Sequence, residues 1–168
     1  MVAFFCPPPF MRSAAVRGAP SLIPFGTGTI FGDYPTRLAT VFDGVTSQFS
    51  TAGAVKTSSS NAYAGKAYSA PVAVSNLVVY GSGNAGFFSI DPTVTIEIRA
   101  KKGAAPASGS DGTLLGSVTF TDTANESAGR TIMSNDTTTY WDRIWAFISG
   151  NQSGSMFLAE IQIVGWTQ

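Results

Sequence analysis

The sequence predicts an all-β protein, a sandwich or barrel of short strands without a helix of any length. Charged residues make up only 12% of the 168 residues, about half the usual share, whereas helical surfaces normally carry many Lys, Glu and Arg. Several segments alternate apolar and polar residues, which is the period of a strand with one face in a core. Turn-forming Gly, Asn, Asp and Ser separate these segments.

The clearest alternation lies in residues 93–100, where Val94, Ile96 and Ile98 share one face. A Gly/Ser/Asn break over residues 81–86 and a Gly/Ala/Ser/Pro loop over residues 103–112 flank this strand. One helical turn is predicted within residues 35–42, before the turn at Asp43 and Gly44. The other predicted strands are residues 72–80, 113–121, 130–133, 141–149 and 155–166.

The segment 141–149 is apolar on both faces. Ile144, Ala146 and Ile148 alternate toward the core, which places Trp145 and Phe147 on the opposite face. Two large aromatic side chains are too apolar to be left in water. The sequence therefore predicts that another part of the chain or a partner covers this outer face.

Residues 1–32 differ from the rest of the chain. They hold five of the nine prolines, four glycines and scattered apolar residues, and they show neither helical nor strand periodicity. Such a segment cannot form a core of its own, yet it is too apolar for a solvated tail. We therefore divide the chain into an extended anchoring arm, residues 1–32, and a sandwich, residues 33–168. The arm would bury its aromatic residues on the sandwich itself or on a partner.

Charge and cysteine content exclude several functions. Ten basic and ten acidic residues leave no net charge and no basic stripe, so we expect no nucleic-acid partner. The cluster of Arg99, Lys101 and Lys102 is interpreted as the solvated end of a strand. Cys6 is the single cysteine and there is no histidine to activate it. Residues 2–6 are too short for a signal-peptide core or a membrane span, so we expect no membrane partner.

The sequence carries no catalytic motif such as G-x-S-x-G, a metal triad or a phosphate loop. Two carboxylates could in principle support glycoside hydrolysis. The aspartates available for this stand mostly at turn positions, where Asp is expected for backbone reasons: Asp33, Asp91, Asp111, Asp122, Asp136 and Asp142. We therefore expect a protein that is not an enzyme.

Five pieces of sequence, in order, resemble a discoidin-like domain, also called coagulation factor 5/8 type C or galactose-binding-like. Residues 39–51, ATVFDGVTSQFST, resemble its early F-D-G segment, with Phe49 where a tryptophan is common. Residues 63–66 (YAGK) and 74–81 (VSNLVVYG) resemble the next strand pair as found in bacteriophage versions. Residues 140–148 (YWDRIWAFI) and 158–165 (LAEIQIVG) resemble the late and closing strands. The resemblance spans about residues 36–166.

The resemblance implies a discoidin-like jelly-roll β-sandwich of eight strands, and in many relatives a structural calcium ion. The matching ligands here are the side chains of Asp43 and Glu160 and the backbone oxygens of Thr40, Val45 and Ala159. Calcium takes six to eight oxygen ligands, and a site with two carboxylates would bind weakly, with a dissociation constant of roughly 10⁻⁴–10⁻³ M. Alternatively, Asp43 only organises an Asx turn and Glu160 caps a nearby backbone amide.

Members of this family often bind sugars or lipid head groups through loops at one end of the sandwich. A sugar site needs an aromatic platform and planar hydrogen-bonding groups. The candidate ligand residues are Tyr34, Arg37, Tyr63, Phe87, Phe88, Tyr140, Asn151 and Gln152. Alternatively, these aromatic residues pack the ends of the sandwich. The family's sugar-binding histidine and paired arginines are not evident in this chain.

Together these features predict a non-enzymatic structural or adhesion protein of a bacteriophage virion, as a head decoration or a tail or fibre component. The arm would bind other virion proteins in a homo-oligomer or multicopy assembly, and the outward-facing sandwich would bind a host glycan. One alternative is a cement protein of the capsid or tail without a ligand. The other is a free bacterial carbohydrate-binding module.

Overall fold

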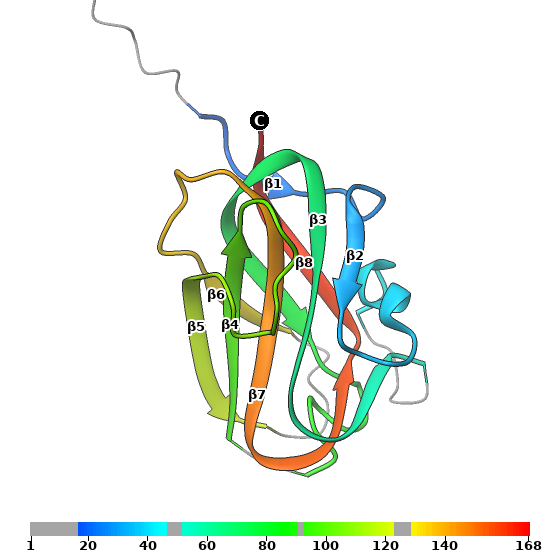
Figure 1. Ribbon diagram of the computed structural model, residues 1–168. Helices are drawn as coiled ribbons and strands as arrows, with labels where there is room; N and C mark the ends of the chain where they lie inside the picture. Colours follow the sequence, from blue (N-terminus) through cyan, green and yellow to red (C-terminus); the bar gives the residue numbers. More distant parts are fainter. Residues whose placement is uncertain (1–16, 47–51, 91–92, 123–128) are drawn as a thin grey trace, which may run out of the picture.

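The computed structural model describes residues 17–46, 52–90, 93–122 and 129–168. These residues form antiparallel strands and one short 3-10 helix, which confirms the predicted all-β class (Figure 1). In chain order the elements are β1 Ser21–Leu22, β2 Thr29–Gly32, η1 Leu38–Phe42, β3 Ala54–Tyr80, β4 Thr93–Lys101, β5 Thr113–Thr121, β6 Arg130–Met133, β7 Trp141–Leu158 and β8 Glu160–Thr167. No helix in this part of the chain could span a lipid bilayer.

The long strand β3 connects the two layers of the sandwich. Its first part pairs with β2 and β7, and its second part pairs with β8 and β6. The register with β7 shifts between Ala67 and Val72, where Pro71 lacks the N–H that a continuous ladder needs. β3 bends at this place, at the end of the molecule that also holds the C-terminus (Figure 1). The sequence predicted only the second part, residues 72–80.

The predicted alternation fills the core. Val94, Ile96 and Ile98 of β4 are buried, and so are Ile144, Ala146 and Ile148 on the neighbouring strand β7. Strands β5 and β6 and the one helical turn also lie where the sequence predicted them. The prediction of one strand over residues 155–166 was wrong. Residues 155–158 end β7, and β8 begins at Glu160, because the Ala159 N–H leaves the β7 ladder and donates to the Tyr80 carbonyl (2.9 Å).

On the outer face of β7, Trp145 is covered as expected, and Phe147 is half-buried. The Trp145 side chain is 0% exposed. Its indole N–H donates to the Gly109 carbonyl (2.7 Å) in the loop after β4, and the Phe31 ring of β2 packs edge-on with ring centroids 6.0 Å apart. The chain itself therefore supplies the cover, through one loop and one strand that lie far from β7 in sequence.

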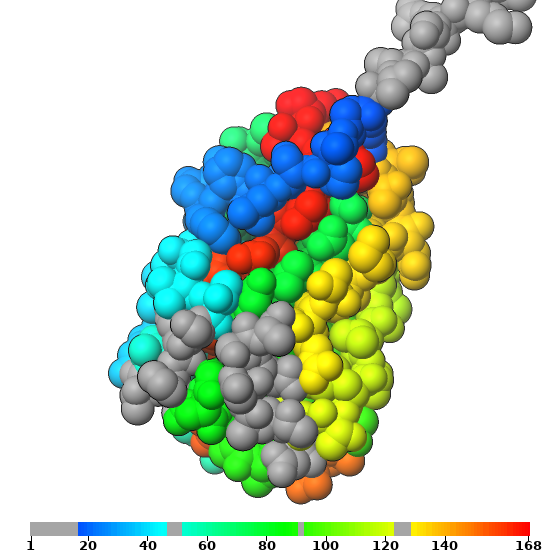
Figure 2. Space-filling model, turned by 180° about the vertical axis from the view of Figure 1, so that it is seen from behind, coloured from blue at the N-terminus to red at the C-terminus, as the bar shows by residue number. Residues whose placement is uncertain are grey.

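Residues 17–32 lie on the sandwich. β1 pairs with β8 through Ser21 and Leu22, β2 pairs with β3, and Ile23 is buried in the core. Figure 2 shows this segment in blue across the surface beside the red β8. Of the two expected docking places, residues 17–32 therefore use the domain itself, and the sheet begins before the predicted boundary at residue 32. Strands of two and four residues are too short to show a period. Residues 1–16 lie outside the described residues.

Candidate functional site

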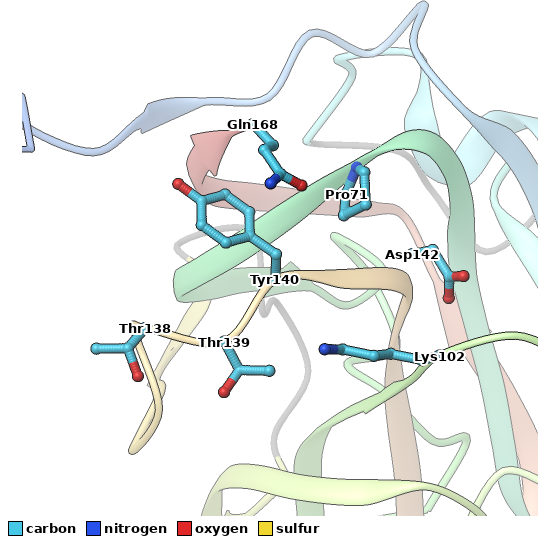
Figure 3. Close-up of a pocket in the computed structure, with 7 residues that line it drawn as sticks. All are labelled: Pro71, Lys102, Thr138, Thr139, Tyr140, Asp142 and Gln168. Atoms are coloured by element: carbon cyan, nitrogen blue, oxygen red, sulfur yellow. The ribbon is translucent and has the colours of Figure 1, made fainter.

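A pocket of about 500 Å³ opens at the end of the sandwich where β7 begins and β8 ends (Figure 3). We call it the Tyr140 pocket. It is assembled from the bend of β3, the residue after β4, the loop before β7, the start of β7 and the residue after β8. Its lining residues are Pro71, Lys102, Thr138, Thr139, Tyr140, Asp142 and Gln168.

The loop before β7 is shaped by Asp136. Its Oδ1 atom accepts hydrogen bonds from the Thr138 N–H (2.9 Å), the Thr138 hydroxyl (2.9 Å) and the Thr139 N–H (3.0 Å). Bonds from Thr139, then those from Thr138, hold the pKa of this carboxyl well below its usual range. The two threonines and Tyr140 are therefore presented to the pocket by a turn fixed by hydrogen bonds.

The opposite wall carries one cation and one anion, Lys102 and Asp142. Both carboxylate oxygens of Asp142 accept from the N–H of Gly103 (3.0 and 3.1 Å), a residue with a φ of +78° that favours glycine. The Lys102 ammonium lies 5.7 Å from the centroid of the Trp141 ring. Figure 3 shows this ammonium pointing toward Thr139 and Tyr140, whereas the carboxylate of Asp142 lies near the Lys102 backbone.

Arg17 fastens the start of the described chain beside the pocket. Its guanidinium lies over the rings of Tyr140 (4.7 Å to the centroid) and Trp166 (5.2 Å). It also donates to the carbonyls of Thr137 and Thr138. The Trp166 indole N–H donates to the Gly18 carbonyl (2.6 Å), so the segment and the pocket wall hold each other in place.

The chemistry of the Tyr140 pocket suits a polyhydroxylated ligand. It combines an aromatic ring, two hydroxyls, a side-chain amide and an ammonium group. Hydroxyls and amides both donate and accept hydrogen bonds, as sugar hydroxyls do. A small number of polar groups that point into a pocket with an aromatic wall is the usual composition of a small-molecule binding site.

Of the predicted ligand residues, Tyr140 alone lines this pocket. Asn151 and Gln152 are exposed on β7, eleven and twelve residues further on, which is about 35 Å along an extended strand. The Asn151 side chain accepts from the Thr93 N–H (3.0 Å). The prediction therefore joined residues from both ends of the sandwich.

Three aromatic residues of the predicted set belong to the interior. Phe87 is 0% exposed and Phe88 2%, and Tyr34 is also buried, so they cannot form a platform for a sugar. Burial raises the pKa of the Tyr34 hydroxyl, and this hydroxyl has no hydrogen-bond partner. These residues pack the sandwich, as the alternative interpretation held.

The last two predicted residues lie away from the pocket. Arg37 is exposed before η1 in a left-handed conformation (φ 53°), and Tyr63 is half-buried in β3, where its ring packs against Phe31. Sequence reasoning missed Pro71, Lys102, Thr138, Thr139, Asp142 and Gln168. The one available signal was Lys102 in its cationic cluster, which we interpreted as a solvated strand end.

The predicted calcium ligands Asp43 and Glu160 do come together. The Glu160 side chain is 0% exposed, and its Oε2 atom accepts from the Gly44 N–H (3.0 Å). An Asp43 oxygen accepts from the Val45 N–H (2.9 Å), the Asx turn of the alternative interpretation. Both contacts of that interpretation are thus present, yet the buried Oε1 atom of Glu160 has no hydrogen-bond partner.

The surroundings of Glu160 fit a cation. Burial raises the pKa of this carboxyl to about 8, the Gly44 N–H opposes the shift, and the charge of Asp43 adds to it. A buried oxygen without a partner and a second carboxylate nearby are what a bound calcium ion would satisfy. Asp43 and Glu160, with the backbone oxygens of Thr40, Val45 and Ala159, would hold it.

A buried ammonium lies close to the same carboxylate. Lys66 of β3 is 2% exposed and donates to the carbonyls of Phe25 and Thr27. Burial lowers its pKa, and the charge of Glu160 opposes this shift. Lys66 thus attaches the segment between β1 and β2 to the sandwich near the candidate calcium site.

The remaining aspartates bind backbone or lysine groups, as expected for turn residues. Asp33 accepts from the Tyr63 N–H (2.8 Å) and pairs with Lys56, and Asp122 is buried against the Phe87 and Phe88 amides. Within residues 17–46, 52–90, 93–122 and 129–168, no three His, Cys, Asp or Glu side chains cluster as metal ligands. Asp91 lies outside these ranges.

Comparison with solved structures agrees with the fold. The family 32 carbohydrate-binding module of C. perfringens NanJ superposes with a TM-score of 0.58 at 17% identity, covering 86% of this chain and 98% of that one. The F5/8 type C domain of a Bacteroides fragilis protein gives 0.53 at 12%, covering 88% and 97%. A striped bass fucolectin gives 0.62 at 13%, covering 88% of this chain and 48% of that one. No family model and no curated protein sequence matches this chain.

The chain therefore has the discoidin-like β-sandwich fold that its sequence predicts, shared with family 32 carbohydrate-binding modules and F5/8 type C domains. At sequence identities of 17% and 12%, these structural comparisons establish the fold alone. Function has to be argued from the site.

Proposed function

We propose that this protein is a non-enzymatic carbohydrate-binding module and that the Tyr140 pocket is its ligand site. The observation that carries the proposal is the pocket itself, in which an aromatic ring, two hydroxyls and an amide converge on about 500 Å³. Neighbours of the same fold include a module solved with galactose and a fucose-binding module of Streptococcus pneumoniae, which makes a glycan the ligand class to test first.

The test is a glycan array followed by titration calorimetry on the best ligand. Tyr140→Ala removes the aromatic wall and should weaken binding by roughly tenfold or more, because each 1.4 kcal/mol of lost contact is tenfold in affinity. Gln152→Ala is the matched control, since Gln152 is exposed on β7 twelve residues further along the chain and does not line the pocket. Loss of binding in Gln152→Ala with full binding in Tyr140→Ala would move the site to the other end of the sandwich.

The finer part of the proposal is a place on a bacteriophage virion, where many copies would turn weak glycan binding into avidity. It is supported by the resemblance of residues 63–66 and 74–81 to bacteriophage versions and by the proline-broken apolar composition of the first residues. Other virion proteins would be bound through residues 1–16, because residues 17–32 are engaged with the sandwich.

Removal of residues 1–16 tests the virion proposal and leaves β1 and β2 in place. A virion component should lose its association with particles and keep its melting temperature. A truncated protein that still copurifies with particles would contradict the anchoring role. A particle-bound protein that binds no glycan would instead be the cement protein of the first alternative, and one that never associates with particles would be the free bacterial module.

Calcium belongs to the proposal as a structural ion. It would supply positive charge between Asp43 and Glu160 and join the turn after η1 to the start of β8. The ion would then connect the first and last parts of the domain, in addition to the hydrogen bond from the Gly44 N–H to Glu160.

A further inference from the structure

We propose that the Tyr140 pocket prefers acidic sugars, and that the Lys102 ammonium binds the carboxylate of a uronic acid residue. This inference rests on the proposed glycan binding at the same pocket. It concerns the charge of the ligand, which the aromatic and hydroxyl groups of the pocket do not determine.

The first observation is that Lys102 presents its charge to the pocket. Its side chain is exposed, lines the wall and points toward Thr139 and Tyr140 (Figure 3). The nearby ion pairs join Lys101 to Asp111 (2.6 Å) and Arg143 to Asp142 (3.4 Å), and Lys102 takes part in neither. The ammonium also lies 5.7 Å from the centroid of the Trp141 ring.

The second observation is that the acidic groups around the pocket are engaged locally. Asp142 accepts from the Gly103 N–H with both oxygens and also lies beside Arg143. The Oδ1 atom of Asp136 accepts three hydrogen bonds from Thr138 and Thr139. Donors of the chain itself therefore partly offset both negative charges.

The third observation is a second cation beside the aromatic wall. The guanidinium of Arg17 lies 4.7 Å from the Tyr140 centroid and bonds to the Thr138 carbonyl (3.2 Å). A ligand in contact with Tyr140 would therefore lie near the charge of Arg17 as well as in the pocket that Lys102 lines. At an ionic strength of about 0.1 M the screening length is roughly 10 Å, so both charges act on a ligand in contact with this ring.

These groups divide the work of recognition. The Thr138 hydroxyl donates to Asp136, so its oxygen can still accept from a sugar hydroxyl, and the amide of Gln168 can both donate and accept. An ammonium group only donates, and its bond to an ionised acceptor is about twice as strong as a neutral one. The carboxylate of a uronic acid is an ionised acceptor of this kind.

Titration calorimetry with tetragalacturonic acid and a mannuronic acid tetramer, each also as its methyl ester, tests the inference. Esterification removes the charge and keeps the sugar. The intact protein should bind at least one free acid roughly tenfold more tightly than its ester, and Lys102→Gln should weaken binding of the acid several-fold more than binding of the ester, so that most of the preference is lost. Lys101→Gln is the matched control, because it removes the same charge one residue away, from an ammonium paired with Asp111, and should keep the preference.

Two results would overturn the inference. Equal binding of acid and ester by the intact protein would show that the carboxylate is not recognised. The proposed glycan binding would still hold, because the uncharged ester is bound. An unchanged preference in Lys102→Gln would assign the selectivity to another group. If neither these sugars nor any glycan of the array is bound, both the inference and the proposed function fail.

Discussion

Asp122→Ala removes a carboxylate that the sequence offered for glycoside hydrolysis and that the structure buries. Asp122 is 1% exposed, and its oxygens accept from the Phe87 N–H (2.9 and 3.1 Å) and the Phe88 N–H (2.7 Å). Both phenylalanines are core residues. A group in this position cannot reach a substrate and instead fixes the backbone that leads into β4.

The magnitude follows from the two amides. Each buried N–H left without an acceptor costs about 1–3 kcal/mol, so Asp122→Ala should lower the free energy of unfolding by about 2–6 kcal/mol. Domains of this kind are stable by only about 5–15 kcal/mol. With a urea m-value of about 2 kcal/mol per molar, the unfolding midpoint should fall by roughly 1–3 M.

Urea unfolding followed by tryptophan fluorescence measures this change. Asp111→Ala is the control, because the Asp111 carboxylate also accepts from two backbone amides, those of Ala107 and Gly112, but at an exposed site. Its midpoint should fall much less, since water replaces the lost acceptor. Equal shifts in the two variants, or an Asp122→Ala midpoint within about 0.2 M of the parent, would refute the reasoning.

Three further outcomes are expected. Millimolar calcium should raise the melting temperature relative to chelator, and Glu160→Gln should remove the difference; identical melts of the parent protein would argue against calcium. Gly65→Ala should lower the free energy of unfolding by about 1–3 kcal/mol in the same urea assay, because the new methyl group would overlap Trp145 on β7, and an unchanged midpoint would contradict this packing. Asp136 has a lowered pKa in the folded state, so its stabilisation is present above about pH 4 and is lost as the pH falls toward the folded-state pKa. Midpoints measured from pH 5 to pH 2 should fall less steeply in Asp136→Asn than in the parent, and equal slopes would contradict the assignment.

The predictions from sequence succeeded where a signal is local. Alternation over residues 93–100 depends only on which side chains face the core, and this strand lies where it was predicted, as does the strand over residues 113–121. They fell short where strands bend or are very short. β3 and β7 each pass through register shifts that divide the period, and β1 has two residues.

The candidate sites show the same division. The F-D-G turn and the closing strand carry recognisable residues, so Asp43 and Glu160 could be paired from their resemblance to a family. The Tyr140 pocket has no such pattern. Its wall contains residues as distant in sequence as Pro71 and Gln168. These two are neighbours only in the folded chain, where the Gln168 N–H donates to the Pro71 carbonyl (3.1 Å).

The sequence by itself determined that this chain is all-β, where most of its strands lie and that the aromatic face of β7 needs a cover. Tertiary structure decided what the cover is, since the Gly109 carbonyl and the Phe31 ring reach Trp145 only through the fold. It also decided which loops meet at one end of the sandwich. The physical reason is the separation in sequence over which each signal acts. Burial and periodicity are properties of one strand, whereas a pocket depends on how distant strands are paired and where they bend.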